Sequence, residues 1–412
     1  MIPGALPPHR VGFRFAGVTV GVASPDPALL AWLEEFLRPA FELTDAASSD
    51  RWVVLDTDDA RLALARARGP LPGAPPVPGF IRDGGPVSLP EWGGGGPDEQ
   101  VLFDPDYQAF YRIHGPTGRV TVLAGVRPNL TRVAVMRVVR ELALAATRAE
   151  EGVLLHAAAV AVEGRGVVLA GPERAGKTTL LLHLLQVPGA AFAANDRVLV
   201  HATGGGAAML RPVPTIVTIR AETLGTFPAI AARIRASGWW HARTLAECDE
   251  PGARRPALTP DGAATLSPAQ LCRVTGTSAI ADTRLWRVIF PRVTAGATGI
   301  RLQRLSAEEA AGRLRAALFG GPAGARRRTA FGAADRDGAV AEAERHRQTA
   351  ELARRVPCHE ARLGAAAFGG PAAAMALVTA LAGEPTAAWH DDAPAGSVGE
   401  ATSPAPPGPA GP

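Results

Sequence analysis

The spacing of apolar residues near the N-terminus predicts strands and helices in a mixed order. Residues 11–22 alternate and are rich in β-branched side chains, which predicts a strand. Residues 27–37 carry apolar side chains at helical spacing and predict a helix. Three further strands are expected at residues 52–55, 107–114 and 120–124.

Two other segments complete this first region. Residues 129–150 read as a long amphipathic helix with Asn129 as its N-cap. Residues 69–98 are dominated by Gly and Pro, so an irregular excursion or flexible loop is expected there. The pattern predicts an α+β N-terminal module over residues 1–150, placed to recognise a substrate or partner.

From residue 151 the pattern changes to apolar strands separated by helices, which predicts an α/β domain over residues 151–383. Two strands, residues 153–162 and 167–170, flank a glycine turn. Further strands are expected at residues 190–194, 215–220, 286–291 and 300–305, and helices at 178–185, 306–318, 339–355 and 371–381.

Some segments fit neither pattern. Residues 242–267 are rich in Pro and charge and are expected to be mobile. Residues 384–412 have too few large apolar groups to fold and are expected to be a disordered tail. Residues 364–383 are apolar, but Gly369-Gly370-Pro371 interrupts them, so a buried helix is expected rather than a membrane span.

The composition narrows the classes of partner. The chain has 412 residues, 47% of them hydrophobic, and a formal charge of +4. Its 42 arginines are dispersed, so neither a nucleic-acid nor a membrane partner is expected; Arg326-Arg327-Arg328 reads as a solvated turn. Arginine in place of lysine suggests a GC-rich bacterial genome.

The cysteines indicate a reducing environment. Cys248, Cys272 and Cys358 are odd in number and far apart, which favours a cytoplasmic protein with free thiols. A zinc site formed by His241 with Cys248 and Cys272 is the alternative.

The only lysine of the chain, Lys177, completes a phosphate-binding loop. The loop matches G-x-x-x-x-G-K-[ST] with the sequence Gly171-Pro172-Glu173-Arg174-Ala175-Gly176-Lys177-Thr178. The next residue, Thr179, is also expected to contact the nucleotide. Backbone N–H groups of such a loop converge on a phosphate at a helix N-terminus. Lys177 is expected to contact the β- and γ-phosphates of a nucleoside triphosphate, and the Thr178 hydroxyl to ligate Mg²⁺.

Neither an LSGGQ-like signature nor an N-K-x-D motif is present, which argues against ABC-type ATPases and GTPases. Instead, a short strand ends in Asn195-Asp196, with Asp196 lying 19 residues after Lys177. Such a strand is able to run beside the P-loop strand and bring Asp196 to the metal and the γ-phosphate.

The order of His156 on a strand, the P-loop and Asn195-Asp196 resembles HPr kinase/phosphorylase and its relatives. The resemblance covers residues 152–200 well and residues 214–224, 285–305 and 352–363 more loosely. It implies the fold type of HPr kinase and the ATP-dependent phosphoenolpyruvate carboxykinases. It also implies ATP-dependent phosphorylation of a hydroxyl, typically a serine.

In that family a pair of acidic residues ends the second strand, and here Asn195 replaces the first of them. An amide is able to ligate Mg²⁺ but not to act as a general base. Three alternatives stay open: Asp196 takes both duties, the chemistry relies on positioning and charge, or transferase activity is lost.

Other residues are weaker candidates. His156 is either a core histidine or a group near the γ-phosphate and Asp196. Arg174 is either a phosphate contact or an exposed loop residue, and Trp239-Trp240 either a substrate patch or packing. The candidates for a transition-state arginine are Arg197, Arg220, Arg287 and Arg292.

Two functions follow from this sequence. The first is a kinase that uses ATP and Mg²⁺, with Asp196, Lys177 and His156 as catalytic residues and Thr178, Asp196 and Asn195 at the metal. Its acceptor would be a peptide, a protein or a small metabolite; no stretch matches the family's signature for engaging HPr. The second is a nucleotide-binding regulatory protein without transferase activity. A homo-oligomer is compatible with either.

Overall fold

The computed structural model describes residues 6–82, 85–125, 128–146, 152–202, 207–239, 256–294, 299–319, 330–331, 338–364 and 370–383. The expected disordered tail and arginine turn lie outside these residues. Trp240, His241 and Cys248 also lie outside them, so the zinc alternative is not addressed. No described helix is long and apolar enough to cross a membrane.

The N-terminal part of the chain forms a seven-stranded sheet with the strand order β3-β1-β2-β4-β9-β8-β7. The pairs β2–β4 and β4–β9 are parallel, and the other neighbours are antiparallel. The strands are β1 (His9–Phe15), β2 (Val18–Ser24), β3 (Glu42–Thr44), β4 (Arg51–Asp56), β7 (Glu99–Asp104), β8 (Ala109–His114) and β9 (Arg119–Ala124).

Two sequence predictions for this region need correction. The single strand at residues 11–22 is a hairpin of β1 and β2, because Ala16 and Gly17 form a two-residue turn with φ of 48° and 80°. The expected irregular excursion contains an antiparallel hairpin of β5 (Val77–Arg82) and β6 (Gly85–Leu89).

Three helices accompany this sheet. Helix α1 (Pro27–Leu37) has the predicted bounds, and the Asp26 side chain caps it. Helix α2 (Asp59–Arg68) was not predicted; the Asp58 side chain caps it. Helix α3 (Pro128–Ala146) begins one residue before Asn129, so the prediction that Asn129 is the N-cap is wrong.

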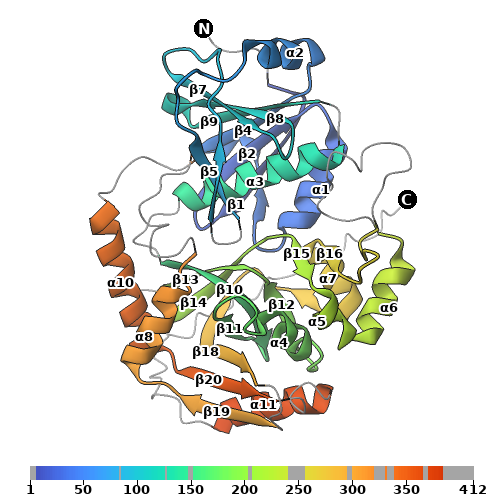
Figure 1. Cartoon of the computed structure of the whole chain (residues 1–412), viewed down its shortest axis with the longest axis vertical. Helices are drawn as coiled ribbons and strands as arrows, with labels where there is room; N and C mark the ends of the chain where they lie inside the picture. The colour runs from blue at the N-terminus through green and yellow to red at the C-terminus, as the bar shows by residue number, and fades with distance from the viewer. Residues whose placement is uncertain are drawn as a thin grey trace, which may run out of the picture.

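Helix α3 is not amphipathic in the expected sense. From Leu130 to Ala143 every residue except Arg132 is buried. The reason is that the helix lies between the two large sheets, as Figure 1 shows, and Leu199 and Val213 of the nine-stranded second sheet belong to the same apolar core as α3. A helix that is covered on all sides is apolar all round, and does not show the polar solvent-facing side of an amphipathic surface helix.

The second sheet has nine strands and is accompanied by helices. This combination confirms the prediction that the region is a mixed α/β structure. The strand order of the sheet is β17-β12-β10-β13-β14-β18-β20-β19, and β11 pairs with β10 and with β18. The strands are β10 (Val153–Val162), β11 (Arg165–Ala170), β12 (Ala191–Ala194), β13 (Arg197–Ala202), β14 (Ala208–Val213), β17 (Ser278–Ala279), β18 (Thr283–Val293), β19 (Ile300–Arg304) and β20 (Cys358–Leu363).

Helices cover both faces of this sheet. One face packs on α4 (Lys177–Leu184), α5 (Ala221–Gly225), α6 (Pro228–Ser237), α7 (Pro268–Thr275) and α11 (Pro371–Gly383); the other packs on α8 (Ala307–Ala316) and α10 (Gly338–Arg355). Buried strands with both faces covered read as continuous apolar runs, as β10 does.

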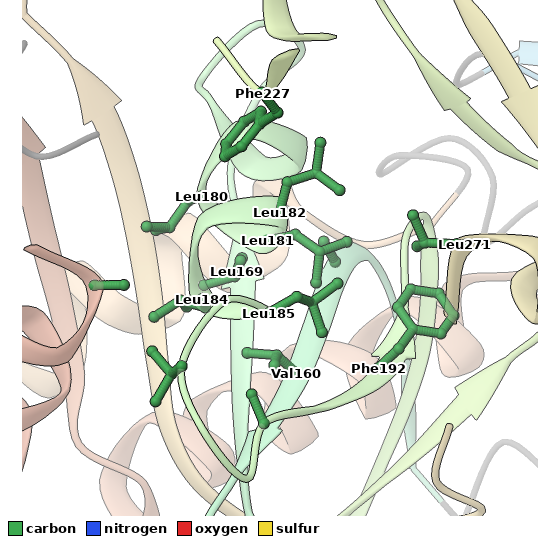
Figure 2. Close-up of a cluster of buried hydrophobic side chains, with 14 of the residues drawn as sticks. Val160, Leu169, Leu180, Leu181, Leu182, Leu184, Leu185, Phe192, Phe227 and Leu271 are labelled. Carbon is green, nitrogen blue, oxygen red and sulfur yellow. The ribbon is translucent and has the colours of Figure 1, made fainter. Parts of the chain in front are cut away.

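Helix α4 fixes the position of the P-loop relative to the sheet. Its residues Leu180, Leu181, Leu182 and Leu184 are buried, and Figure 2 shows them in one cluster with Leu169 of β11. Each such leucine contributes about 1.5–3 kcal/mol relative to an exposed one. The first turn of α4 is therefore held firmly against the end of β11.

The expected mobility of residues 242–267 is wrong for their last part. Residues 264–266 form β16 (Ala264–Leu266), whose three residues are all buried. This strand pairs with β15 (Val217–Ile219) in a separate two-stranded sheet. Residues 242–255 lie outside the part of the chain that the structure describes.

Candidate functional site

The P-loop lies between the end of β11 and the start of α4. Gly171 and Gly176 have φ of 149° and 98°, a backbone conformation that favours glycine. A Cβ at Gly176 would also lie 2.8 Å from Val293 Cγ2. The loop thus turns back over the first turn of α4, where backbone N–H groups have no partner within the helix.

The Lys177 ammonium is held by the loop itself. Its Nζ donates to the carbonyl oxygens of Gly171 at 2.8 Å and Pro172 at 3.0 Å. Burial lowers the pKa of Lys177, and the charges of Asp196 and Glu173 offset part of this shift. Both acids therefore lie close enough to act on the lysine that would contact a polyphosphate.

Asp196 and His156 line the same cleft as the P-loop and lie next to each other there. His156 Nε2 lies 3.3 Å from Asp196 Oδ1, and both side chains are 35% exposed. This exposure rules out the reading of His156 as a core histidine. The backbone holds the pair together, because the Ala157 N–H donates to the Asp196 carbonyl at 3.0 Å.

The strand that leads to Asp196 runs elsewhere than expected. β12 pairs with β10 and not with β11, so the prediction that it runs beside the P-loop strand is wrong. The reason is that both edges of β11 are taken, by the antiparallel β10 and the parallel β18. Asp196 nevertheless shares a cleft with Lys177.

The oxygen atoms around this point suit Mg²⁺. Thr178, Asn195 and Asp196 all line the cleft, and the buried Asn195 Oδ1 has no hydrogen-bond partner among the described residues. In the part of the chain that the structure describes, no group of three or more His, Cys, Asp or Glu is able to hold a metal. A donor set this small fits Mg²⁺, which proteins hold through one or two side chains and substrate phosphates.

The cleft has a volume of 1260 Å³ and is shared by the two parts of the molecule. The second sheet and its loops contribute the P-loop, His156 and Asp196. The N-terminal part contributes residues of α3 and the neighbouring Tyr107. A volume of this size is sufficient for a nucleotide and a second substrate together.

The four candidate transition-state arginines occupy different surroundings. Arg287 is fully buried, donates to the carbonyl oxygens of Leu381 and Trp286, and does not line the cleft. Arg292 is exposed on β18 and also lies outside the cleft lining. Neither of these two arginines therefore lines the cleft in this structure.

Arg197 and Arg220 both line the cleft, as does the exposed Arg174. Arg220 forms an ion pair with Glu173 of the P-loop, and its hydrogen bond, with its charge second, lowers the pKa of that carboxyl. Arg197 is 4% exposed and stacks over the Phe319 ring at 4.0 Å. Arg197 is thus fixed in place, whereas Arg220 is paired at the surface.

Three charged residues of α3 belong to the site and were missed by the sequence analysis. Glu141 Oε1 accepts from Arg197 Nη1 at 2.8 Å and from Arg140 Nη2 at 3.3 Å. Arg137 and Arg140 line the cleft. Burial, with the nearby Arg197 charge second, lowers the pKa of Arg140 to about 9. The sequence could have indicated these three residues, because they are charged residues within a helix that is otherwise strongly apolar.

The remaining candidates are structural. Trp239 packs against the apolar core beside α4, and it does not line the cleft. Cys272 and Cys358 are buried free thiols, and burial raises their pKa to about 11 and about 12. Thiols with such pKa values are unreactive.

The site therefore combines a P-loop, a half-exposed acid–histidine pair and a wall of arginines from α3. A phosphate-binding loop and a facing carboxylate are the parts that phosphoryl transfer requires. Comparison with models of protein families and with curated proteins found no match to this chain.

Proposed function

We propose that this protein is an ATP- and Mg²⁺-dependent kinase that transfers the γ-phosphate to a hydroxyl group. The observation that carries the proposal is the convergence of Lys177, Thr178 and Asp196 on one cleft. The acceptor would be a serine of a peptide or protein, or a hydroxylated metabolite. The motif order of His156, P-loop and Asn195-Asp196 supports a fold and mechanism of the HPr kinase type.

Each residue has a defined role in this proposal. The loop amides and Lys177 bind the β- and γ-phosphates. Thr178, Asp196 and Asn195 would hold Mg²⁺, which neutralises charge that develops on the phosphate oxygens. Asp196 accepts the proton of the acceptor hydroxyl, and His156, 3.3 Å away, orients the carboxylate.

Phosphoryl transfer proceeds through a loose transition state that needs little help from a base. Positioning of the two substrates accounts for most of the rate enhancement in such a reaction. The replacement of an acidic residue by Asn195 is therefore compatible with a working kinase. The free thiols of Cys272 and Cys358 agree with activity in a reducing compartment such as the bacterial cytoplasm.

The test uses purified full-length protein, γ-labelled ATP and a lysate of the source organism. We expect label on a peptide, a protein or a metabolite, and loss of that label with Asp196→Asn. Asp59→Asn, an exposed change on α2 away from the cleft, is the matched control and should leave labelling unchanged.

A second measurement tests nucleotide binding by itself. Lys177→Ala should weaken ATP binding by about a hundredfold or more in equilibrium dialysis, because the cation that contacts the phosphates is gone. Unchanged affinity would refute the assignment of the site. Tight ATP binding without transfer would instead favour the regulatory protein that Asn195 also suggests, and phosphate release without a labelled acceptor would indicate a plain ATPase.

A further inference from the structure

Helix α3 contributes one wall of the cleft. This wall carries positive charge, and few hydrogen-bond acceptors in the described part of the chain lie near its arginines. Arg137 is 7% exposed and Arg140 is 4% exposed, and both line the cleft that contains Lys177. They lie one turn apart on α3, and Arg140 shares Glu141 with Arg197 of β13. Three guanidinium groups thus gather where the N-terminal part meets the second sheet.

The carboxylates nearby do not satisfy this charge. Glu141 is the one carboxylate within hydrogen-bond distance of Arg140 among the described residues, and Arg197 holds it more closely. Arg137 Nη1 lies 3.9 Å from Asp104 Oδ2, and this oxygen already accepts from the Tyr111 hydroxyl at 3.0 Å. Burial raises the pKa of Asp104 despite the Arg137 charge, which weakens this pairing further.

Two donors of this pair are left over. Arg137 Nη1 and Arg140 Nε are buried and have no hydrogen-bond partner in the part of the chain that the structure describes. A buried guanidinium without a full set of acceptors is costly for a protein that serves no anion there. A carboxylate or a phosphate entering from the cleft would supply both the charge and the acceptor oxygens, since guanidinium groups bind either in forked geometry.

The nucleotide does not account for these residues. Its phosphates have their own cradle in the P-loop, which belongs to the second sheet and α4. Arg137 and Arg140 belong to the other part of the molecule. Tyr107, whose ring lies 5.0 Å from the Arg137 guanidinium, lines the same side of the cleft and offers an aromatic face.

We propose that Arg137 and Arg140 form an anion subsite that binds a carboxylate or phosphate group of the phosphate acceptor. This inference rests on the kinase function proposed above. It narrows the acceptor to hydroxyl compounds or peptides that carry a negative charge near the hydroxyl. The subsite would select such acceptors and place their hydroxyl toward the P-loop.

The test measures anion binding directly. Full-length protein saturated with Mg²⁺ and a non-hydrolysable ATP analogue is titrated with inorganic phosphate, and separately with succinate, by isothermal calorimetry. We expect saturable binding of at least one anion, and the tighter of the two identifies the group. The double change Arg137→Gln/Arg140→Gln should weaken this binding by about tenfold or more.

Matched variants separate binding from folding. Arg137→Lys/Arg140→Lys keeps the charge but loses the forked geometry, so this variant should bind the anion more tightly than the Gln variant and less tightly than the wild type; a purely structural role would not require this order. Arg61→Gln, on the exposed surface of α2, should have no effect. No saturable binding of either anion up to about 20 mM, or equal binding by the Gln variant, would overturn the inference.

A last titration distinguishes this inference from the kinase proposal. Lys177→Ala without nucleotide lacks the P-loop cation but keeps both arginines. Phosphate or succinate binding by this variant would support the anion subsite even if the wild type fails to bind ATP. Loss of anion binding in Lys177→Ala, with retention in the Gln variant, would assign the anion to the P-loop alone and overturn the subsite.

Discussion

The ion cluster around Glu141 joins helix α3 to the second sheet, and its removal should destabilise the protein strongly. Glu141 is 8% exposed and accepts from Arg197 at 2.8 Å and from Arg140 at 3.3 Å. Glu141→Gln keeps the shape of the side chain and removes only its charge. The two buried guanidinium groups then lose the carboxylate that they share, and the carboxylate that Arg197 keeps is Asp196, whose Oδ2 lies 3.5 Å from Arg197 Nε.

The magnitude follows from that arrangement. Breaking a buried ion pair by removing one partner costs about 3–5 kcal/mol, because the remaining charge stays desolvated. Since each kcal/mol shifts the Tm of a large domain by ~2–4 °C, we expect a fall of about 10 °C at pH 7. The same change should strengthen phosphate binding at the anion subsite, because the competing carboxylate is gone.

The pH dependence has a defined sign. Burial alone raises the pKa of Glu141, but the charges of Arg197 and Arg140 outweigh it and hold the pKa below its usual 4.5. A carboxyl with a lowered folded-state pKa stabilises the protein above the unfolded value, and this contribution is lost as the pH falls through the folded value. The stability gap between wild type and Glu141→Gln should therefore narrow as the pH drops below 4.5.

Thermal unfolding followed by circular dichroism, at several pH values and with or without phosphate, measures these effects. Glu99→Gln is the control: its partner Arg112 lies 2.9 Å away, but the two side chains are 31% and 41% exposed. An exposed pair of this kind contributes ~0–1 kcal/mol. Equal effects of the two substitutions, or a gap that widens in acid, would refute the reasoning.

Three further outcomes test other parts of the structure. Leu181→Ala in the α4 core should lower the free energy of unfolding by about 2–5 kcal/mol in urea titrations, whereas Leu64→Ala, at a site 57% exposed, should change it by ~0.5 kcal/mol or less. Gly176→Ala should lose most ATP binding in equilibrium dialysis, because its Cβ would lie 2.8 Å from Val293 Cγ2 at a φ of 98°; normal affinity would contradict the loop geometry. Asn195→Asp should raise the rate of phosphate transfer by about tenfold, since it adds a second carboxylate beside Asp196; an unchanged or lower rate would mean that the amide is the better ligand.

Several elements could be predicted because their signals are local. The helix bounds of α1 follow from Pro27 and the Asp26 cap, and the P-loop from its glycines and the single lysine. The strands β10 and β11 are long apolar runs separated by a glycine turn. In each case the residues that determine the element lie within it or beside it.

Other elements depend on contacts that the local pattern does not encode. β13 and β14 carry polar residues whose partners come from the N-terminal part: Arg197 pairs with Glu141 of α3, and the Arg211 guanidinium lies over the Phe15 ring of β1. The pairing of β12 with β10 instead of β11 depends on β18, which is about 90 residues away in the chain. The arginines of α3 were missed for the same reason, because their surroundings come from the second sheet.

The burial of α3 between the two large sheets also limits which changes of sequence this protein tolerates. Leu199 and Val213 of the second sheet share a core with α3, so the boundary between the two parts is packed apolar surface rather than a linker. A fragment that begins at residue 152 would expose that surface to water, which promotes aggregation. The N-terminal part is therefore not an interchangeable module, and if the proposed kinase function holds, new acceptor preferences would arise by point substitution along α3 rather than by recombination of whole segments.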